Sequence, residues 1–368
     1  MPIFLRSTDG NPDSRLQKYI DSLSCNGILY HSLCWDRCLK YEDDLSYTYY
    51  HQEATYGSGI KNARKLLGFN FFLLKQLIKK RKTYKVIHAC DFDTILPAIF
   101  MKLFFRKKVI YDIFDWFVDS RELHNIFIKK SILFLEYINL KYSDITIICE
   151  EERKEQIRFQ TQKLWILPNI PNFKVKCKEE VLKNNDKIIL SYVGVLTKHR
   201  GIEKILECAK LMSDRLELNI AGFGELEQMV VSYSKNSSNI HFYGTVAYEK
   251  GIRIMTQSDI ILALYEKTIP NHIYAAPNKY YEGLYLGKPI LTTQGTFVGA
   301  KTEKYKTGFA VDENIESLKH FFIQEGLEEQ ITIYADNAKK MWKNKYYNYV
   351  ETFMMEKYIP YLRINELV

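Results

Sequence analysis

Short apolar runs that alternate with helical patterns are the feature of this sequence that most limits its fold. In the first half the expected strands are "PIFLR", "GILYHSL", "KVIHAC", "KVIYDIF", "ITIIC" and "KLWILPN". Helical patterns cover residues 12–24, 60–81, 93–105 and 124–141. This alternation is typical of parallel α/β architecture, in which each strand is buried on both faces.

A polar stretch divides the 368 residues into two similar halves, and a chain of this length is expected to form two domains. The stretch "PNIPNFKVKCKEEVLKNNDK" has no clear periodicity, and the strand pattern then resumes with "KIILSYVGVL", "LELNIAG", "IHFYG", "DIILALY", "KPILTT" and "GFAV". We therefore predict a first Rossmann-like domain over residues 1–170, a linker over 171–186 and a second over 187–335. A helical segment, 336–368, is expected to pack back on the first domain.

Two doubly wound domains of this kind place a ligand at the carboxyl ends of their strands, in the cleft between them. The composition, 46% hydrophobic and 26% charged, is typical of a soluble globular protein. No secretory signal or apolar stretch of membrane-spanning length is evident, and the seven cysteines are odd in number without a C-x-x-C pair. These features favour a cytoplasmic protein with reduced cysteines and argue against a zinc site.

The net charge of +8 is concentrated in part of the first half, where residues 61–85 contain nine Lys or Arg and no acid. Apolar residues are interleaved, so a basic amphipathic helix could lie on an anionic membrane surface. The alternative is a solvated face opposite a core stripe of Phe71, Leu74 and Ile78. Nucleic-acid binding is not indicated, because none of the common recognition signatures is present.

Four loops of the second half lie where strands end and helices begin, of which "FYGTVAYEKGIRIM" is uninformative by itself. In "YVGVLTKHRGIEKI", Lys198 and Arg200 precede a helix start, which favours a phosphate partner over a merely solvated basic loop. The G-x-G of "IAGFGELEQM" is equally explained by a tight turn. In "APNKYYEGLYLGKPI", Glu282 lies at the centre of a short helical pattern, either by ordinary amphipathicity or to hold a ligand hydroxyl.

Taken in order, "VGVLTKHRGIEK", "IAGFGEL", "IHFYGTV", "SDIILALYE", "PNKYYEGLYLGKPIL" and "TGFAV" resemble the nucleotide-binding half of retaining glycosyltransferases of the GT-B fold, of the large fourth family. The resemblance is close over residues 187–312 and looser in the first half, through "RSTDGNPDSRLQKYIDSL", "KVIHACDFDTILPAI" and "KKVIYDIFDWF". It implies an α/β fold with two Rossmann-like domains facing a central cleft.

The resemblance also implies a donor site. Glu282 is expected to bind the ribose hydroxyls, Asn278 and Lys279 to lie near the diphosphate or donor sugar, and Arg200 to hold the diphosphate with help from Lys198. The remaining donor-binding candidates are Gly194, Gly224 near the phosphates, Val246 near the base, and Tyr274. Three residues depart from the family pattern: Tyr274 replaces a Glu, Val195 an Arg and Cys90 a His.

The acceptor is expected at the N-terminal domain. Its first loop offers Gly10 for close backbone approach and three polar candidates, Asp9, Asn11 and Arg15. His88 is either an acceptor contact or a hydrogen-bonded histidine at a strand end. Asp91 and Asp115, at strand ends, are candidates for acceptor or sugar contacts and for the catalytic set with Arg200 and Lys198; either could instead cap the following helix.

The function implied is retaining transfer of a hexose from a UDP- or GDP-sugar to a glycan or lipid-linked glycan. The leaving diphosphate takes the acceptor proton, without cofactor or metal. The expected setting is bacterial surface polysaccharide synthesis, O-antigen or capsule, in the cytoplasm at the inner face of the plasma membrane. Two alternatives stay open: a non-catalytic sugar-nucleotide-binding scaffold and an epimerase of the same fold. A dinucleotide oxidoreductase is disfavoured, because the first loop lacks G-x-G-x-x-G.

Overall fold

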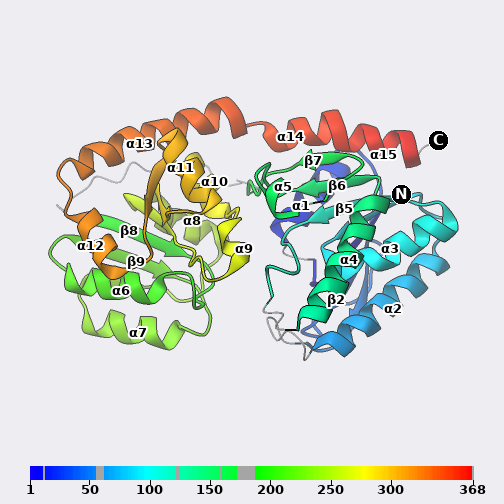
Figure 1. The fold of residues 1–368 in the computed structure, drawn as a ribbon, viewed down its shortest axis with the longest axis horizontal. Helices are drawn as coiled ribbons and strands as arrows, with labels where there is room; N and C mark the ends of the chain where they lie inside the picture. The colour runs from blue at the N-terminus through cyan, green and yellow to red at the C-terminus, as the bar shows by residue number, and fades with distance from the viewer. Residues whose placement is uncertain (11–12, 55–61, 122–124, 158, 172–186, 367–368) are drawn as a thin grey trace. The chain divides into compact units, whose positions relative to one another are not determined.

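The computed structural model describes residues 1–10, 13–54, 62–121, 125–157, 159–171 and 187–366 (Figure 1). The chain forms two compact units. One unit comprises Met1–Pro168 together with Asn348–Val368, and the other comprises Asn169–Tyr347. The predicted linker, apart from Pro171, lies outside the described residues.

The N-terminal unit is built on a seven-stranded parallel sheet of order β3-β2-β1-β4-β5-β6-β7. Its strands are β1 (Ile3–Arg6), β2 (His31–Asp36), β3 (Tyr47–His51), β4 (Val86–Cys90), β5 (Lys108–Ile113), β6 (Ile145–Ile148) and β7 (Leu164–Ile166). The six predicted strands are confirmed, although β2 begins only at His31. The edge strand β3 was not predicted, because its sequence "YTYYH" has no run of aliphatic residues.

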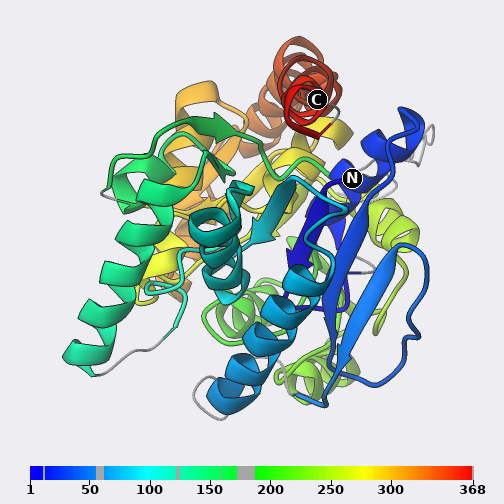
Figure 2. The same ribbon diagram turned by 90° about the vertical axis from the view of Figure 1, so that its right-hand side faces the viewer.

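Helices cover both faces of this sheet (Figures 1 and 2). On one face lie α2 (Ala63–Lys79), α3 (Phe92–Phe105) and α4 (Ile126–Tyr142), which share a core with the sheet. On the other lie α1 (Ser14–Cys25) and the C-terminal helices α14 (Tyr349–Phe353), η3 (Met354–Tyr358) and α15 (Ile359–Glu366). The short helix α5 (Arg153–Ile157) precedes β7.

The predicted core stripe of α2 is wrong in one respect. Phe71 is 72% exposed, whereas Phe69, Leu73 and Leu77 are fully buried. Leu74 and Ile78 are partly buried beside them. The helix is therefore rotated so that its core stripe is centred on 69, 73 and 77, and Phe71 lies on the outer face.

The C-terminal unit contains a six-stranded parallel sheet of order β10-β9-β8-β11-β12-β13. The strands, all predicted, are β8 (Ile188–Val193), β9 (Leu216–Ala221), β10 (Ile240–Phe242), β11 (Ile260–Ala263), β12 (Ile290–Thr293) and β13 (Gly308–Val311). The helices are α6 (Ile202–Leu211), α7 (Glu227–Asn236), α8 (Tyr248–Thr256), α9 (Pro270–Ile273), α10 (Asn278–Leu286), α11 (Phe297–Tyr305), α12 (Ile315–Phe322), α13 (Leu327–Met341) and η2 (Trp342–Tyr346).

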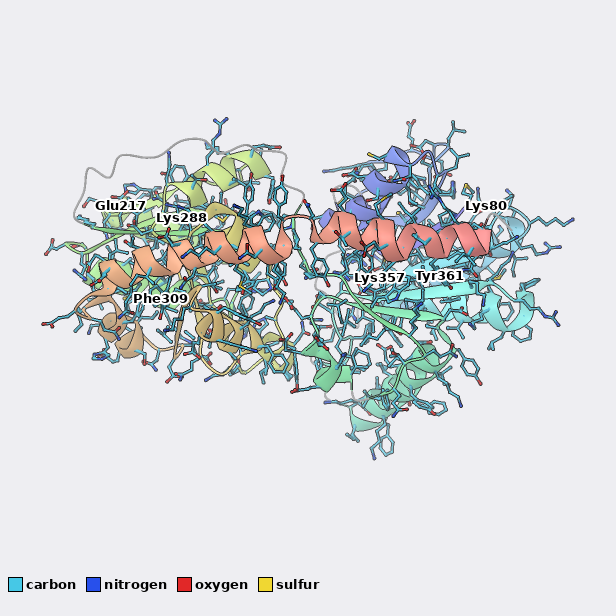
Figure 3. All side chains as sticks on the ribbon, turned by 90° about the horizontal axis from the view of Figure 1, so that it is seen from above. Lys80, Glu217, Lys288, Phe309, Lys357 and Tyr361 are labelled. Atoms are coloured by element: carbon cyan, nitrogen blue, oxygen red, sulfur yellow. The ribbon has the colours of Figure 1, made fainter. Side chains whose placement is uncertain are left out.

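The last helices belong to different units. α13 and η2 are part of the C-terminal unit, and the chain passes to the N-terminal unit between Tyr347 and Asn348, so that Lys357 and Tyr361 lie on helices of that unit (Figure 3). Over the described part of the chain, no helix is both long and apolar enough to cross a membrane.

Candidate functional site

Two loops meet at the carboxyl ends of β8 and β9. The Gly194 N–H donates to Ala221 O at 3.0 Å, and the Leu196 N–H donates to Phe223 O at 2.8 Å. A Cβ at Gly222 would overlap the carbonyl of Gly194, and one at Gly224 would overlap that of Leu196; both glycines have φ near +150°. The G-x-G therefore allows the close packing of the two loops.

Lys279, in the first turn of α10, reaches this pair of loops. Its Nζ lies 4.6 Å from the centroid of the Tyr192 ring, and a Cβ on Gly194 would come within 2.9 Å of it. Burial lowers the pKa of Lys279 to about 8; Arg200 lowers the pKa further and Glu282 opposes the shift. Because desolvation makes the ammonium form costly, an anion bound at Gly194 would be strongly favoured by Lys279.

Glu282 follows one turn later on α10 and is buried, with 6% of its surface exposed. Its described hydrogen bond comes from Tyr248, whose hydroxyl donates to Oε1 at 3.3 Å. Burial raises the pKa of Glu282, although Lys279 and the bond from Tyr248 oppose the shift. A carboxylate can accept about four hydrogen bonds, so Glu282 has capacity left for the hydroxyls of a ligand.

The loop that carries Arg200 is fixed by an acidic residue. Glu266 accepts from His199 Nδ1 at 2.8 Å and from Lys204 Nζ at 2.6 Å, and its N–H donates to His199 O at 3.0 Å. Burial by itself would raise the pKa of Glu266, but the hydrogen bonds from Lys204 and His199 outweigh it and lower the pKa. Arg200 places its guanidinium 4.7 Å from the centroid of the Tyr265 ring.

Sequence reasoning missed Glu266. The available signal was an acid placed directly after the strand pattern "DIILALY", at the sheet edge where the other candidates gather.

The other predicted donor-site residues make no described contact with Lys279 or Glu282. Lys198 is exposed, and its N–H donates to Glu225 at 2.9 Å. Asn278 is exposed at the start of α10, Val246 is half-buried close to Gly251, and the ring of Tyr274 packs edge-on against Phe297. The structure therefore brings together Gly194, Lys279, Glu282 and Arg200.

In the N-terminal unit, Asp91 directly follows β4, has φ of +65° and is held by Arg6. Arg6 donates to Asp91 and to Asp13, each at 2.6 Å, and the Phe114 N–H donates to Asp91 at 2.8 Å. Burial raises the pKa of Asp91 to about 6, and Arg6 opposes the shift. Asp91 occupies the N-cap position of α3, as the capping interpretation held, but its side chain makes no capping hydrogen bond. The Asp115 side chain is 60% exposed, and its Oδ1 lies 3.3 Å from Nη2 of Arg153.

Arg15 and His88 make hydrogen bonds to other buried side chains of the N-terminal unit. Arg15 donates to Asp112 from Nε and Nη2, the shortest distance being 2.6 Å, and Tyr19 donates to the same carboxylate at 2.7 Å. His88 is completely buried, with Nδ1 2.9 Å from the Tyr358 hydroxyl and Nε2 3.4 Å from Asp112. Both side chains are too buried to contact an acceptor, and the hydrogen-bonded interpretation of His88 is favoured.

The predicted first loop is described only in part. Gly10 has φ of +74°, and a Cβ there would lie 2.7 Å from Cys34 Sγ. Asp9 accepts from the Arg37 N–H at 3.3 Å. Asn11 lies outside the described residues.

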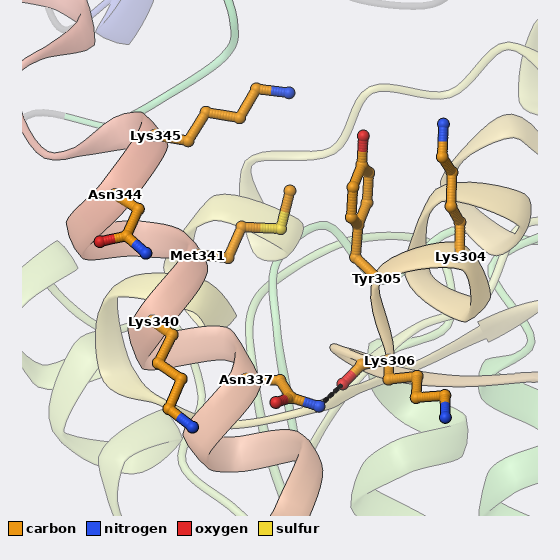
Figure 4. Close-up of a pocket in the computed structure, with 8 residues that line it drawn as sticks. All are labelled: Lys304, Tyr305, Lys306, Asn337, Lys340, Met341, Asn344 and Lys345. Carbon is orange, nitrogen blue, oxygen red and sulfur yellow. Dashed lines mark hydrogen bonds between the residues drawn. The ribbon is translucent and has the colours of Figure 1, made fainter.

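A pocket of about 420 Å³ in the C-terminal unit is separate from these residues (Figure 4). It is lined by Lys304, Tyr305, Lys306, Asn337, Lys340, Met341, Asn344 and Lys345. None of the predicted site residues lines it, so we do not identify it with the donor site.

The two parallel sheets with helices on their faces match the two Rossmann-like domains of solved GT-B glycosyltransferases, and the fold is of this class. Sucrose-phosphate synthase from Thermosynechococcus elongatus has a TM-score of 0.72 at 14% identity, covering 99% of this chain and 100% of that chain. HepE of Anabaena, in complex with UDP and glucose, has a TM-score of 0.68 at 13% identity, and the match covers 98% of this chain and 99% of that chain. WaaG, a glycosyltransferase involved in lipopolysaccharide biosynthesis, has a TM-score of 0.66 at 13% identity, covering 95% and 98%.

The second half of the chain is similar in sequence to known glycosyltransferases. Residues 174–344 match the family of glycosyl transferases group 1. An uncharacterized glycosyltransferase of Methanocaldococcus jannaschii is 31% identical over 210 residues, which are 54% of this chain and 47% of the relative. The chain thus spans about half the length of the curated relative that it matches.

Proposed function

We propose that this protein is a retaining, fourth-family glycosyltransferase that moves a hexose from a nucleotide-sugar to a glycan acceptor. The observation that carries the proposal is the position of Lys279. Its partly desolvated amino group lies against Gly194, with Glu282 one turn further along the same helix. This spacing suits a nucleoside diphosphate, whose phosphates need a cation and whose ribose needs a hydrogen-bond acceptor.

The proposed roles follow from the charges. Lys279 and Arg200 neutralise the diphosphate as the bond between C1 of the sugar and the phosphate oxygen breaks. The acceptor oxygen forms the new bond to C1 on the same face, and its proton passes to the departing phosphate oxygen. The protein stabilises the leaving group and positions the acceptor, which are large contributions to catalysis in such reactions. We propose that this occurs without a metal or other cofactor.

The substrates and setting are proposed by analogy. HepE was solved in complex with UDP and glucose, which supports a UDP-sugar donor, with a GDP-sugar as the alternative. WaaG takes part in lipopolysaccharide biosynthesis, which supports an oligosaccharide or lipid-linked acceptor in bacterial surface polysaccharide synthesis. We place the reaction in the cytoplasm, at the inner face of the plasma membrane. Asp91 and Asp115 are the proposed contacts for the acceptor or the donor sugar.

The proposal is tested by incubating the purified protein with UDP- and GDP-sugars and measuring release of the nucleoside diphosphate. We expect slow hydrolysis that is lost in Arg200→Ala and unchanged in the control Arg253→Ala, an exposed arginine on α8. Binding without turnover, with or without added glycan acceptors, would favour the scaffold alternative.

Two finer parts of the proposal have separate tests. The anomeric configuration of the product, measured by NMR as it forms, should match that of the donor; inversion would contradict retention. Activity should persist in EDTA, and its full loss would contradict metal independence.

A further inference from the structure

The pocket between the end of α11 and the helices α13 and η2 is lined by cations and by no acid (Figure 4). We call it the α11–α13 pocket. Lys304 and Lys306 come from the end of α11, Lys340 from α13 and Lys345 from η2. Over the part of the chain that the structure describes, none of these four amino groups forms an ion pair. Their charge is therefore available to a ligand.

The lysines form two pairs at opposite ends of the pocket. In Figure 4 the side chains of Lys304 and Lys345 extend to one side, as does the Tyr305 hydroxyl, and those of Lys306 and Lys340 extend to the other. The amino groups of Lys304 and Lys345 lie 5.3 and 5.6 Å from the centroid of the Tyr305 ring, so both can reach one anionic group beside that ring. Like charges gathered without an acid repel one another, and an anion bound between them removes this repulsion.

Neutral hydrogen-bonding groups and one apolar side chain lie between the two lysine pairs (Figure 4). Asn337 donates to Lys306 O at 3.1 Å, which holds its amide in place. Asn344 and Tyr305 are exposed and offer an amide and a hydroxyl, and Met341 is half-buried and supplies an apolar surface. Amides and hydroxyls bind the hydroxyl groups of a sugar, and an apolar surface suits its C–H groups.

We propose that the α11–α13 pocket binds a phosphorylated saccharide, with a phosphate at each lysine pair and the sugar between them. Lysine is a common partner of phosphate groups, to which it offers a compact positive charge. The volume of about 420 Å³ is within the range of small-molecule sites. A metal cation would be repelled by the four lysines. The site lies outside the proposed donor site, because Lys279, Glu282 and Arg200 do not line it.

The test is titration calorimetry of the full chain with glucose 1,6-bisphosphate, which carries a phosphate at each end of the sugar. Glucose 6-phosphate reaches only one lysine pair and should bind about tenfold more weakly, and uncharged glucose should show no measurable binding. Pyrophosphate has the charge without the sugar and is too short to reach both pairs, so it should also bind more weakly than the bisphosphate. Affinity for the bisphosphate should fall as salt is raised, because the charges are screened.

Two double variants test the two ends of the pocket separately, Lys304→Gln/Lys345→Gln and Lys306→Gln/Lys340→Gln. Each should bind glucose 1,6-bisphosphate about tenfold more weakly than the wild type does. In each, the bisphosphate should also lose its advantage over glucose 6-phosphate, because only one end of the pocket remains charged. All four lysines are exposed, so melting curves without ligand should be unchanged.

The matched control is Lys235→Gln/Lys343→Gln, which removes the same charge from α7 and η2 at exposed positions that do not line the pocket. This variant should bind the bisphosphate as the wild type does. Lys279→Ala should bind it equally well, and the pocket variants should keep their affinity for UDP or GDP. Failure of this inference is thereby distinguished from failure of the proposed function.

A free sugar phosphate and a phosphorylated glycan chain share this chemistry. A phosphorylated oligosaccharide that binds much more tightly than glucose 1,6-bisphosphate would identify the chain as the ligand, and equal affinity would identify the free sugar. The inference is overturned by no binding of the bisphosphate, by equal affinity for pyrophosphate, or by undiminished binding in both pocket variants. It is also overturned if Lys279→Ala abolishes the binding, or if an acidic peptide such as polyglutamate binds the pocket more tightly than any phosphorylated sugar.

Discussion

The two units use charged side chains in opposite ways. In the N-terminal unit, both oxygens of the Asp112 carboxylate are saturated, because they accept hydrogen bonds from Arg15 and Tyr19, and His88 Nε2 lies 3.4 Å away. In the C-terminal unit, Glu282 has one described hydrogen bond, from Tyr248, and Lys279 has a lowered pKa. A saturated buried network stabilises a fold, whereas buried charges with unused hydrogen-bonding capacity are suited to a ligand.

The largest effect on stability is expected from Arg15→Ala, which leaves Asp112 buried without its main counter-charge. Arg15 and His88 keep the pKa of Asp112 below its ordinary value despite burial. Loss of one partner of such a pair costs about 3–5 kcal/mol of unfolding free energy. Thermal melts should show a large decrease in Tm for Arg15→Ala and almost none for Arg253→Ala; overlapping curves would refute the saturated network.

Glu282→Ala should leave stability nearly unchanged and weaken nucleotide binding. Hydrogen bonds to a charged acceptor contribute about 1.5–3 kcal/mol, so the loss should be about 10- to 150-fold in affinity. Thermal shift with UDP and GDP checks this, with the exposed Glu303→Gln as control. An undiminished shift in Glu282→Ala would rule out the ribose contact.

The affinity for a nucleoside diphosphate should depend on pH through Lys279. The pKa of Lys279 is about 8, so the ammonium form predominates below pH 8 and is lost above it. Affinity should therefore decline above pH 8, approaching tenfold per pH unit. Lys279→Arg should bind without this decline, since arginine stays charged. A decline that persists in Lys279→Arg would assign the pH dependence to another group.

The smallest effect is expected from Glu266→Gln. Glu266 is partly exposed and positions His199, next to Arg200, rather than a ligand. An ion pair of this exposure contributes about 0.2–1 kcal/mol, so donor affinity should fall by less than about fivefold. Calorimetry measures the loss of donor affinity in Glu266→Gln and in Glu282→Ala. If the two variants lose equal affinity, Glu266 has a direct role at the ligand.

The sequence predicts the strands well where aliphatic runs are continuous and fails where they are not. All six strands of the C-terminal sheet were predicted, whereas β3, made of Tyr, Thr and His, was not. The outer position of Phe71 was also missed, because only tertiary packing decides which of two neighbouring stripes faces the core.

The candidate site was predictable from chain order, and its supporting contacts were not. Lys279, Glu282 and Arg200 were selected from strand-end loops and a family resemblance. Glu266 was missed because its partners His199 and Lys204 lie far from it in sequence. Conversely, Arg15 was predicted as an acceptor candidate of the first loop, but it lies in α1 and is buried by its hydrogen bonds to Asp112, which is 97 residues away.

The central claim is that Lys279 binds the diphosphate of a nucleotide, and titration calorimetry with UDP, GDP and the matching nucleosides tests it most directly. For whichever base binds, Lys279→Ala should weaken binding of the nucleoside diphosphate by about tenfold or more and leave the affinity for the nucleoside unchanged. Equal losses for nucleotide and nucleoside, or no loss for either, would contradict the claim.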